Sequence, residues 1–264
     1  MRSTVFLGGG RITSALVAGL LLAGDRKSIV VYDRNPPKLR RLQKLYGVRT
    51  ERDLHRALKD AKFLIIAVRP NSLKNLLRET GQVDHPLVAI SLVAGVPVTK
   101  LRNRLGAHVR WCRAMPSPAS RNGRGLTALA FDRKMKLSDR REVKGLFAKI
   151  GPVIEIPESK FDAFTVTYSA SHGYHALSTL ARGGEKIGLD REIALLAAAH
   201  ALADGIIAWR EGKTSLDELL NEAATPGGIA AAVMRSLDAA GYKRAVQRAL
   251  VAGLKRTRSN AGLI

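Results

Sequence analysis

Residues 5–13, Val-Phe-Leu-Gly-Gly-Gly-Arg-Ile-Thr, decide the fold of this 264-residue chain. They complete the apolar run Ser3–Leu7, turn at three glycines and open a helical pattern that continues to Leu22. A strand, a glycine turn and a helix in this order form the turn that holds a dinucleotide pyrophosphate. The stretch therefore predicts an α/β dinucleotide-binding domain, and a purely structural glycine turn is the alternative.

Each position of the glycine turn has an expected task. Gly8 permits the tight turn, and Gly10 lets the backbone approach a pyrophosphate at the helix N-terminus, beside Arg11 and Ile12. Thr13 stands where a third Gly or Ala is usual, so the packing of helix on strand must accommodate a larger side chain.

Strand-like and helical segments alternate through the first half of the chain. The strand-like runs are almost wholly apolar, which is typical of a parallel sheet covered by helices on both faces. Helices are expected over 12–22, Pro36–Tyr46 and Ser138–Ile150. The predicted strands are Ser3–Leu7, Ser28–Tyr32, Phe63–Val68, Leu87–Leu92, Val109–Cys112, Leu126–Phe131 and Val153–Ile156.

The pattern changes after Pro157, where alanine dominates and helical spacing replaces strand-like runs. We therefore predict an α/β domain over residues 1–154 and an all-α domain over residues 155–264. The predicted helices of the second domain are Asp162–Ala181, Arg191–Glu211, Ser215–Glu222, Gly228–Ala240 and Tyr242–Thr257.

Charge divides the chain at the same place. The sequence holds 44 Lys and Arg against 22 Asp and Glu. Residues 1–154 carry 31 of these basic residues and 10 of the acidic ones, whereas residues 155–264 carry 13 and 12. A basic surface attracts nucleic acid, but no nucleic-acid-binding motif or basic–aromatic stacking surface accompanies it, so that partner is not expected.

The lone cysteine, Cys112, excludes a disulfide framework and a thiolate zinc site. The apolar stretch Ala15–Ala23 is too short to cross a bilayer, and no small-residue cleavage site makes it a signal peptide. We therefore expect a cytoplasmic protein with no membrane partner.

The end of the second predicted strand bears on the choice of cofactor. Asp33 lies about 20 residues after the glycine turn, where an acidic residue can accept a hydrogen bond from a ribose 2′-hydroxyl. Arg34 follows it, backed by Lys38, Arg40 and Arg41, and arginine suits a 2′-phosphate. The basic cluster favours NADP, and Asp33 keeps NAD open.

Further segments lie beyond strand ends, where ligands of open α/β sheets bind. Two of these, Ala67-Val68-Arg69-Pro70 and the loop Ser91–Val96 with Ala94, are expected to flank the nicotinamide, and the alternative is that Pro70 and Gly95 only terminate strands. Met115-Pro116, in a loop made rigid by its prolines, is a further candidate for cofactor binding. Thr225-Pro226-Gly227-Gly228 lies between two helical patterns. A hydroxyl at an N-cap position and two glycines would expose backbone N–H groups to a carboxylate, and an ordinary helix–helix turn is equally open.

Together these segments, in this order and spacing, resemble the pyrroline-5-carboxylate reductase family over essentially the whole chain. The resemblance implies a Rossmann-type domain followed by a helical domain that forms an interlocked homodimer or a larger homo-oligomer. It also implies hydride transfer from NAD(P)H to the C=N carbon of 1-pyrroline-5-carboxylate, or a related imino acid, within proline biosynthesis. The matching segments are the glycine turn, Ala67–Pro70, Ser91–Val96, Arg113–Pro116, Asp162-Ala163, Ser169–Ser171, Thr225–Gly228 and Gly241–Ala245.

The resemblance also implies the substrate-binding residues. The family's loop binds the substrate carboxylate through hydroxyl and backbone N–H groups, a role that falls to Thr225, Gly227 and Gly228. The family usually has Thr-Thr or Ala-Thr next, and its second Thr bonds the imine nitrogen; here Ile229 and Ala230 stand there.

Two other site segments also depart from the family pattern. Where the family has Ser-Gly-Ser-Gly-Pro-Ala-Tyr, this chain has Ser169-Ala170-Ser171-His172-Gly173-Tyr174-His175. Where the family has Met-Pro-Asn-Thr-Pro, this chain is one residue shorter and has only Ser117 between the two prolines. Changes confined to site segments indicate altered substrate choice. The candidate substrate pocket therefore comprises Ser169, Ser171, Thr225, Gly227, Gly228 and Ala230.

His172 and His175 are the candidate proton donors in place of the missing threonine. Histidine titrates near neutrality, and residues three apart share a helix face, from which Tyr174 points away. The alternative is that the histidines fill a polar subunit interface. No metal is expected, because no nearby carboxylate or thiolate completes a ligand set.

Two rival functions remain at this point. A 3-hydroxyacid dehydrogenase has the same layout but needs a catalytic Lys and an Asn one turn later, and Lys186 is followed at that spacing by Asp190. A non-catalytic nucleotide sensor or nucleic-acid binder gains from the basic half and from the missing imine donor.

Overall fold

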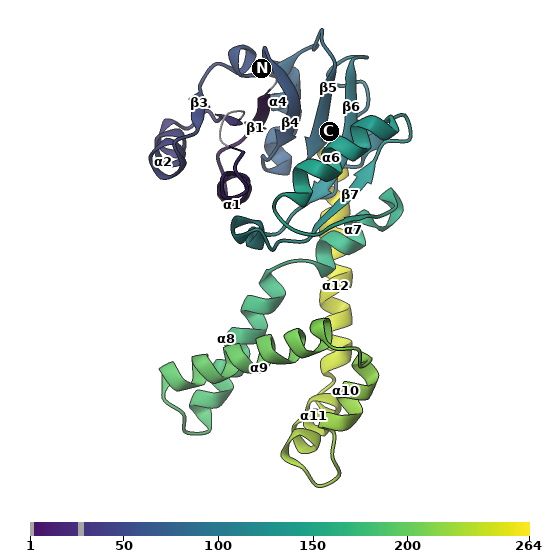
Figure 1. The fold of residues 1–264 in the computed structure, drawn as a ribbon. Helices are drawn as coiled ribbons and strands as arrows, with labels where there is room; N and C mark the ends of the chain where they lie inside the picture. Colours follow the sequence, from purple (N-terminus) through teal and green to yellow (C-terminus); the bar gives the residue numbers. More distant parts are fainter. Residues whose placement is uncertain (1–2, 26–28) are drawn as a thin grey trace. The chain divides into compact units, whose positions relative to one another are not determined.

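A computed structural model describes residues 3–25 and 29–264 of the chain. Close packing divides it into two compact units (Figure 1). The sheet unit runs up to Tyr168 and is completed by Gly253–Ile264, and the helical unit is Ser169–Ala252. Helix α12 (Tyr242–Ser259) therefore contributes to both units.

An eight-stranded sheet forms the centre of the sheet unit, in the order β3-β2-β1-β4-β5-β6-β7-β8. Neighbouring strands are parallel except β6 and β7, which are antiparallel. The strands are β1 Ser3–Leu7, β2 Ile29–Tyr32, β3 Arg49–Glu51, β4 Ala61–Ile66, β5 Leu87–Ser91, β6 Val109–Met115, β7 Thr127–Phe131 and β8 Val153–Glu155.

The sheet confirms the predicted strands and corrects the prediction in two respects. A wholly parallel sheet is wrong at β6 and β7, because only the 3-10 turn η1 (Pro118–Asn122) lies between them and a parallel crossover needs a longer connection. The short edge strand β3 escaped prediction because its residues are charged or polar. Ser28, predicted to begin the second strand, lies outside the described residues.

Helices cover both faces of the sheet, which explains why its strands are apolar throughout. Side chains alternate along β1, so that Phe6 joins the core on one face and Val5 and Leu7 the core on the other. The helices on the Phe6 face are α1 Arg11–Leu22, α2 Pro36–Tyr46 and α6 Leu137–Ala148, and those on the opposite face are α3 Leu54–Leu58, α4 Pro70–Thr80 and α5 Val98–Leu101.

The single helix predicted over Asp162–Ala181 is wrong, because two helices occupy this stretch. Helix α7 (Glu158–Thr167) packs Phe161 against β7, and α8 begins at Ser171. Between them the Tyr168 hydroxyl donates to the Leu126 carbonyl oxygen at 2.8 Å. The Ser169 hydroxyl also accepts from the Ser171 backbone N–H, a local bond that competes with the helical pattern.

The helical unit is built from alanine-rich helices, as predicted, and α9 has the predicted bounds. Gly184 of α8 lies so close to Ala194 of α9 that a Cβ on the glycine would be 3.3 Å from the alanine methyl. Small residues therefore set the α8–α9 contact. The helices are α8 Ser171–Lys186, α9 Arg191–Glu211, α10 Leu216–Ala223, α11 Ile229–Ala239 and the first part of α12.

The boundary between the two packed units differs from the predicted domain boundary after residue 154. The prediction assigns dinucleotide binding to residues 1–154 and dimerisation with substrate binding to residues 155–264. Helix α7 and the end of α12 nevertheless pack within the sheet unit. The assignment of roles stays a prediction.

Candidate active site

The predicted cofactor segments all begin beside one row of paired residues across the sheet. The register pairs Tyr32 with Leu7, Leu7 with Ile66, Ile66 with Ser91, and Ser91 with Arg113. In β2, β1, β4 and β5 this is the last residue of the strand. Parallel strands thus bring the glycine turn and the three loops after β2, β4 and β5 to one edge.

The glycine turn is shaped by a close backbone contact. Gly8 has a φ of +108°, and a Cβ on it would lie 2.6 Å from the carbonyl oxygen of Ala67. Gly10 is the N-cap of α1, and a Cβ there would meet none of the described atoms within 4 Å. The N-cap of α1 is therefore uncrowded and has no side-chain cap, which leaves the first N–H groups of the helix, with Arg11 and Ile12, to a pyrophosphate.

Thr13 is accommodated at the third position of the fingerprint by a hydrogen bond. Its side chain is fully buried, and its hydroxyl donates to the carbonyl oxygen of Gly8. The larger residue thus ties α1 to the turn that it follows.

The Asp33 carboxylate has hydrogen-bond and ion-pair partners within the protein. Its Oδ2 accepts from the Gly9 backbone N–H at 2.7 Å, and its Oδ1 accepts from the Asn35 N–H at 2.8 Å. The Lys38 ammonium lies 3.2 Å from Oδ2. Arg34, predicted to bind a 2′-phosphate, is more than half exposed and pairs with Glu79, which raises the pKa of the guanidinium.

The segment after β4 leads directly into a helix. Ala67 contacts Gly8, Val68 packs against the core, and Arg69 is the exposed N-cap of α4. Pro70 occupies the first turn of α4, where its missing N–H costs nothing. The segment therefore borders the glycine turn on its β4 side.

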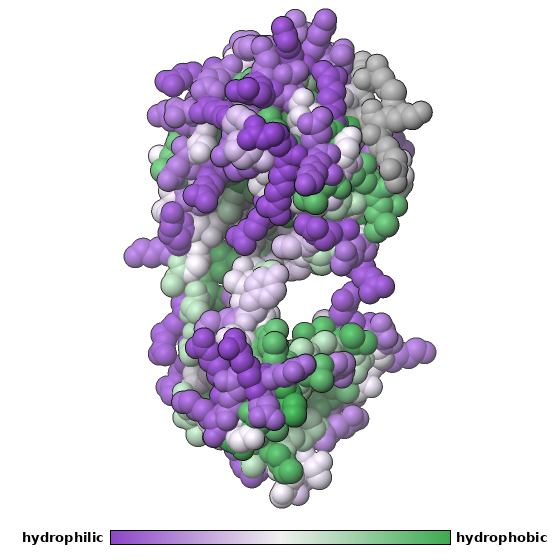
Figure 2. Space-filling view, turned by 90° about the vertical axis from the view of Figure 1, so that its left-hand side faces the viewer, coloured by the Kyte–Doolittle hydropathy of each residue, from purple (hydrophilic) through white to green (hydrophobic). Residues whose placement is uncertain are grey.

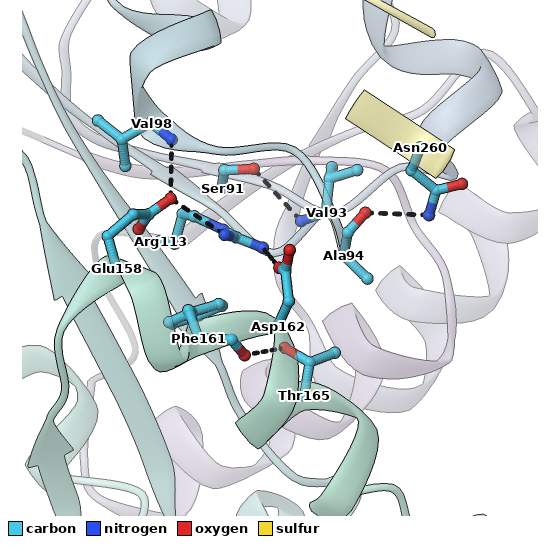
Figure 3. A network of polar contacts seen from close by, with 10 residues as sticks. All are labelled: Ser91, Val93, Ala94, Val98, Arg113, Glu158, Phe161, Asp162, Thr165 and Asn260. Carbon is cyan, nitrogen blue, oxygen red and sulfur yellow. Dashed lines mark hydrogen bonds and ion pairs between the residues drawn. The ribbon is translucent and has the colours of Figure 1, made fainter. Parts of the chain in front are cut away.

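The loop after β5 lies within a polar network that joins distant parts of the chain (Figure 3). The Arg113 guanidinium is 1% exposed and lies between Glu158 and Asp162, at 3.1 and 2.8 Å. It also stacks 4.2 Å from the centre of the Phe161 ring. Two carboxylates and a ring compensate the buried charge and fix α7 against β6.

The same network reaches the loop backbone. Glu158 Oε1 accepts from the Val98 backbone N–H at 3.1 Å, and Asn260 Nδ2 donates to the Ala94 carbonyl oxygen at 3.1 Å (Figure 3). Sequence reasoning missed Glu158 and Asn260, because neither belongs to a motif at a strand end. Met115 and Pro116 follow Arg113 and are partly and fully buried.

In the helical unit, the start of α8 carries the predicted histidines and serines. The hydroxyls of Ser169 and Ser171 lie 2.7 Å apart. His172 and His175 are exposed in the first turns of α8, and the His175 ring nitrogen Nδ1 is 3.5 Å from the Thr179 hydroxyl.

The Thr225–Gly228 segment forms a turn between α10 and α11, and one predicted detail of it is wrong. The N-cap of α11 is Gly228, whereas the Thr225 hydroxyl donates to the Glu222 carbonyl oxygen at 3.2 Å. Gly227 has a φ of +78°, which suits glycine. Gly228 forms no side-chain cap, so the first N–H groups of α11 stay available to an anion.

Two family models match the chain. One, described as NADP oxidoreductase coenzyme F420-dependent, covers residues 3–95, and the other, described as pyrroline-5-carboxylate reductase dimerisation, covers residues 158–260. A pyrroline-5-carboxylate reductase from Mycobacterium tuberculosis is 30% identical over 97% of this chain and 96% of that protein. One from Thermus thermophilus is 34% identical over 95% of each. This chain belongs to the pyrroline-5-carboxylate reductase family.

Solved structures of pyrroline-5-carboxylate reductases share the fold. The enzyme from Coxiella burnetii matches with a TM-score of 0.85 at 23% identity, over 98% of both chains. The enzyme from Plasmodium falciparum, solved with NADP bound, matches with a TM-score of 0.83 at 20% identity, also over 98% of both chains.

The structure also bears on the dehydrogenase alternative. Lys186 is the last residue of α8 and Asp190 is the N-cap of α9. The two residues therefore lie on different helices, and the pattern of a lysine and an amide one turn apart on one helix is absent at these positions.

The predicted departure from the family pattern lies directly after the Thr225–Gly228 turn. Ile229 is 87% exposed within the single chain, and Ala230 is exposed beside it. Neither side chain can donate a hydrogen bond to an imine nitrogen.

Proposed function

We propose that this member of the pyrroline-5-carboxylate reductase family catalyses hydride transfer from NADPH to the C=N carbon of 1-pyrroline-5-carboxylate or a closely related imino acid. One observation carries the proposal. The glycine turn and the loops after β2, β4 and β5 leave the sheet beside one row of paired residues, where dinucleotides bind in this fold class. Membership of the family supplies the substrate class.

The chain's part at the cofactor is to bind and orient. NADPH, when bound, supplies the hydride. Gly8, Gly10, Arg11 and Ile12 would hold the pyrophosphate, because the open first turn of α1 fits an anion. The segments assigned to the nicotinamide end are Ala67, Val68, Arg69, Pro70, Ala94, Met115 and Pro116.

NADPH is preferred over NADH because of the contacts of Asp33. One oxygen of this carboxylate accepts from the Gly9 N–H of the glycine turn and the other from the Asn35 N–H of the β2–α2 turn, and Lys38 offsets its charge. A 2′-phosphate therefore meets a lysine and Arg34 in place of an uncompensated carboxylate. NADH is the second-choice cofactor.

At the substrate end, the turn before α11 would bind the carboxylate. Gly227 and Gly228 form the turn that exposes the first N–H groups of α11, which favour an anion, and the Thr225 hydroxyl would turn from the Glu222 carbonyl oxygen to join them. Ser169 and Ser171 offer further hydroxyls, and Ala230 enlarges the pocket where a threonine is usual. Such a site acts by positioning and electrostatics.

His172 and His175 are the proposed proton donors. Both lie at the start of α8 next to the Ser169–Ser171 segment, and Ala230 cannot serve. An imidazolium can deliver the proton that the product nitrogen needs near neutral pH.

The helical unit is proposed to assemble with a second copy. Figure 2 shows apolar side chains gathered on the helical unit, and α9 exposes about half or more of Leu195, Leu196 and Ile206. By length and composition alone, the 21-residue helix α9 is also long and apolar enough to span a membrane. His200 and Asp204, 3.2 Å apart within α9, are costly in a bilayer, so a homodimer or larger homo-oligomer in the cytoplasm is preferred.

Steady-state oxidation of NADPH and NADH with a panel of cyclic and linear imines tests the proposed function. We expect turnover with 1-pyrroline-5-carboxylate or a close analogue, and a kcat/KM at least about tenfold higher with NADPH than with NADH. His172→Gln and His175→Gln, assayed in parallel across pH, should lower kcat for whichever residue donates the proton. NADPH binding without turnover of any imine would favour a nucleotide sensor.

A further inference from the structure

The loop between β5 and α5 is held by a residue from the far end of the sequence (Figure 3). Asn260 follows α12 directly and is 7% exposed. Its Nδ2 donates to the Ala94 carbonyl oxygen at 3.1 Å, and its Oδ1 accepts from Arg256 Nη1 at 2.9 Å. Because both ends of the amide are used, its donor end is directed at the loop.

The loop backbone also packs directly on the last turn of α12. Gly95 is buried with a φ of +76°, and a Cβ on it would lie 1.8 Å from the Thr257 carbonyl oxygen. No side chain fits between the loop and the helix. The contact between Gly95 and α12 is therefore as close as two backbones allow.

Both ends of the loop are fixed as well. At its start, Ser91 Oγ accepts from the Val93 backbone N–H at 3.3 Å. At its end, the Val98 N–H donates to Glu158, which the buried Arg113 holds in place. Between these two ends, the hydrogen bond from the Asn260 side chain to the Ala94 carbonyl oxygen holds the middle of the loop.

We propose that Asn260 is a positioning residue that sets the 92–96 loop for the nicotinamide half of the cofactor. The proposal rests on the proposed function, which puts the nicotinamide beside this loop. The loop begins after Ser91, the last residue of β5, whereas the glycine turn begins after Leu7, the last residue of β1; β4 lies between these two strands. A shift of Ala94 therefore changes the space beyond β5 and leaves the glycine turn in place. Hydride transfer tolerates little misplacement of the reacting carbon.

Asn260→Ala and Asn260→Asp separate positioning from packing. Alanine removes the donor, whereas aspartate keeps the size and the Arg256 contact but directs an oxygen at the Ala94 carbonyl. We expect the Kd of NADPH, measured by titration calorimetry, to rise about three- to tenfold in Asn260→Ala and further in Asn260→Asp. The Kd of 2′,5′-ADP, which lacks the nicotinamide, should stay within twofold, and kcat should fall with both substitutions.

Lys100→Ala is the matched control. Lys100 Nζ donates to the Ala261 carbonyl oxygen at 2.9 Å, so this substitution removes a contact of the same tail without touching the loop. We expect its nucleotide affinities to equal those of the wild type. Thermal unfolding of every variant shows that the fold is retained.

Three results would overturn the proposal. Both Asn260 variants could bind NADPH as the wild type does, they could lose 2′,5′-ADP and NADPH equally, or Asn260→Ala could be the more damaging, as a packing role predicts. A wild-type protein that binds neither nucleotide would overturn the proposed function too, so the two failures are distinguishable.

Discussion

Asp33 stands at the end of β2, where an acidic residue in a dinucleotide-binding domain can bond the ribose 2′-hydroxyl. Here its carboxylate binds the Gly9 N–H, the Asn35 N–H and the Lys38 ammonium. Oδ2 thus helps to fix the glycine turn relative to β2, and Oδ1 helps to fix the turn between β2 and α2. We propose that Lys38, by offsetting the Asp33 charge, makes this arrangement compatible with a 2′-phosphate.

Lys38→Ala is expected to raise the Kd of NADPH about tenfold and to leave the Kd of NADH within about twofold. Without Lys38 the Asp33 charge is uncompensated and repels the 2′-phosphate, which NADH lacks. Titration calorimetry with both cofactors measures the effect. Lys44→Ala, an exposed lysine at the end of the same helix, is the control and should change neither value. An equal loss for both cofactors would show that Lys38 acts on the fold of the turn instead.

Residues whose role depends on the local chain could be predicted from the sequence. Gly8 and Asp33 lie at fixed distances along a strand–turn–helix unit, and the structure places both beside the turn. Asn260 could not be found in this way, because its partner Ala94 is 166 positions distant in the sequence. Neither residue belongs to a periodic pattern that would have indicated the contact.

At the scale of elements, the close approach of α12 to the β5–α5 loop makes Gly95 the most demanding glycine. Gly95→Ala should lower the free energy of unfolding by about 1 kcal/mol for its left-handed backbone and by roughly a further 1–3 kcal/mol for the clash with Thr257. Gly47→Ala measures the cost of the left-handed backbone alone, because Gly47 has a φ of +64° and a Cβ on it would meet no atom of the described residues within 4 Å. Urea denaturation of both variants measures the difference. Equal losses would contradict the close contact.

Element positions were predictable where the hydrophobic pattern is continuous and failed where local bonds interrupt it. Helix α9 has the predicted bounds, because apolar and alanine residues recur along it with only His200 and Asp204-Gly205 between them, and no proline interrupts it. The break between α7 and α8 was missed, because it depends on the Tyr168 bond to a residue of the sheet unit. The direction of β7 was missed because strand direction follows from the connection, which carries no periodicity.

At the scale of the whole molecule, the exposed apolar residues of the helical unit require a partner surface. Leu196→Glu on α9, where the leucine is 61% exposed, should raise the dissociation constant of the proposed homodimer at least about a hundredfold by burying a charge. Leu137→Glu is the matched control, because Leu137 is 73% exposed on α6 of the sheet unit. Size-exclusion chromatography with light scattering measures the mass in solution of each of the two variants. A Leu196→Glu protein with the wild-type mass would place the interface elsewhere.

The central claim, hydride transfer from NADPH to an imine carbon, is tested most directly by isotope transfer. NADPH deuterated at the transferred position of the nicotinamide is incubated with 1-pyrroline-5-carboxylate and the protein, and the product is examined by mass spectrometry. We predict proline carrying one deuterium on the carbon that was doubly bonded to nitrogen, formed in equal amount to the NADP⁺ released. Proline without deuterium, or consumption of NADPH without proline, would contradict the account.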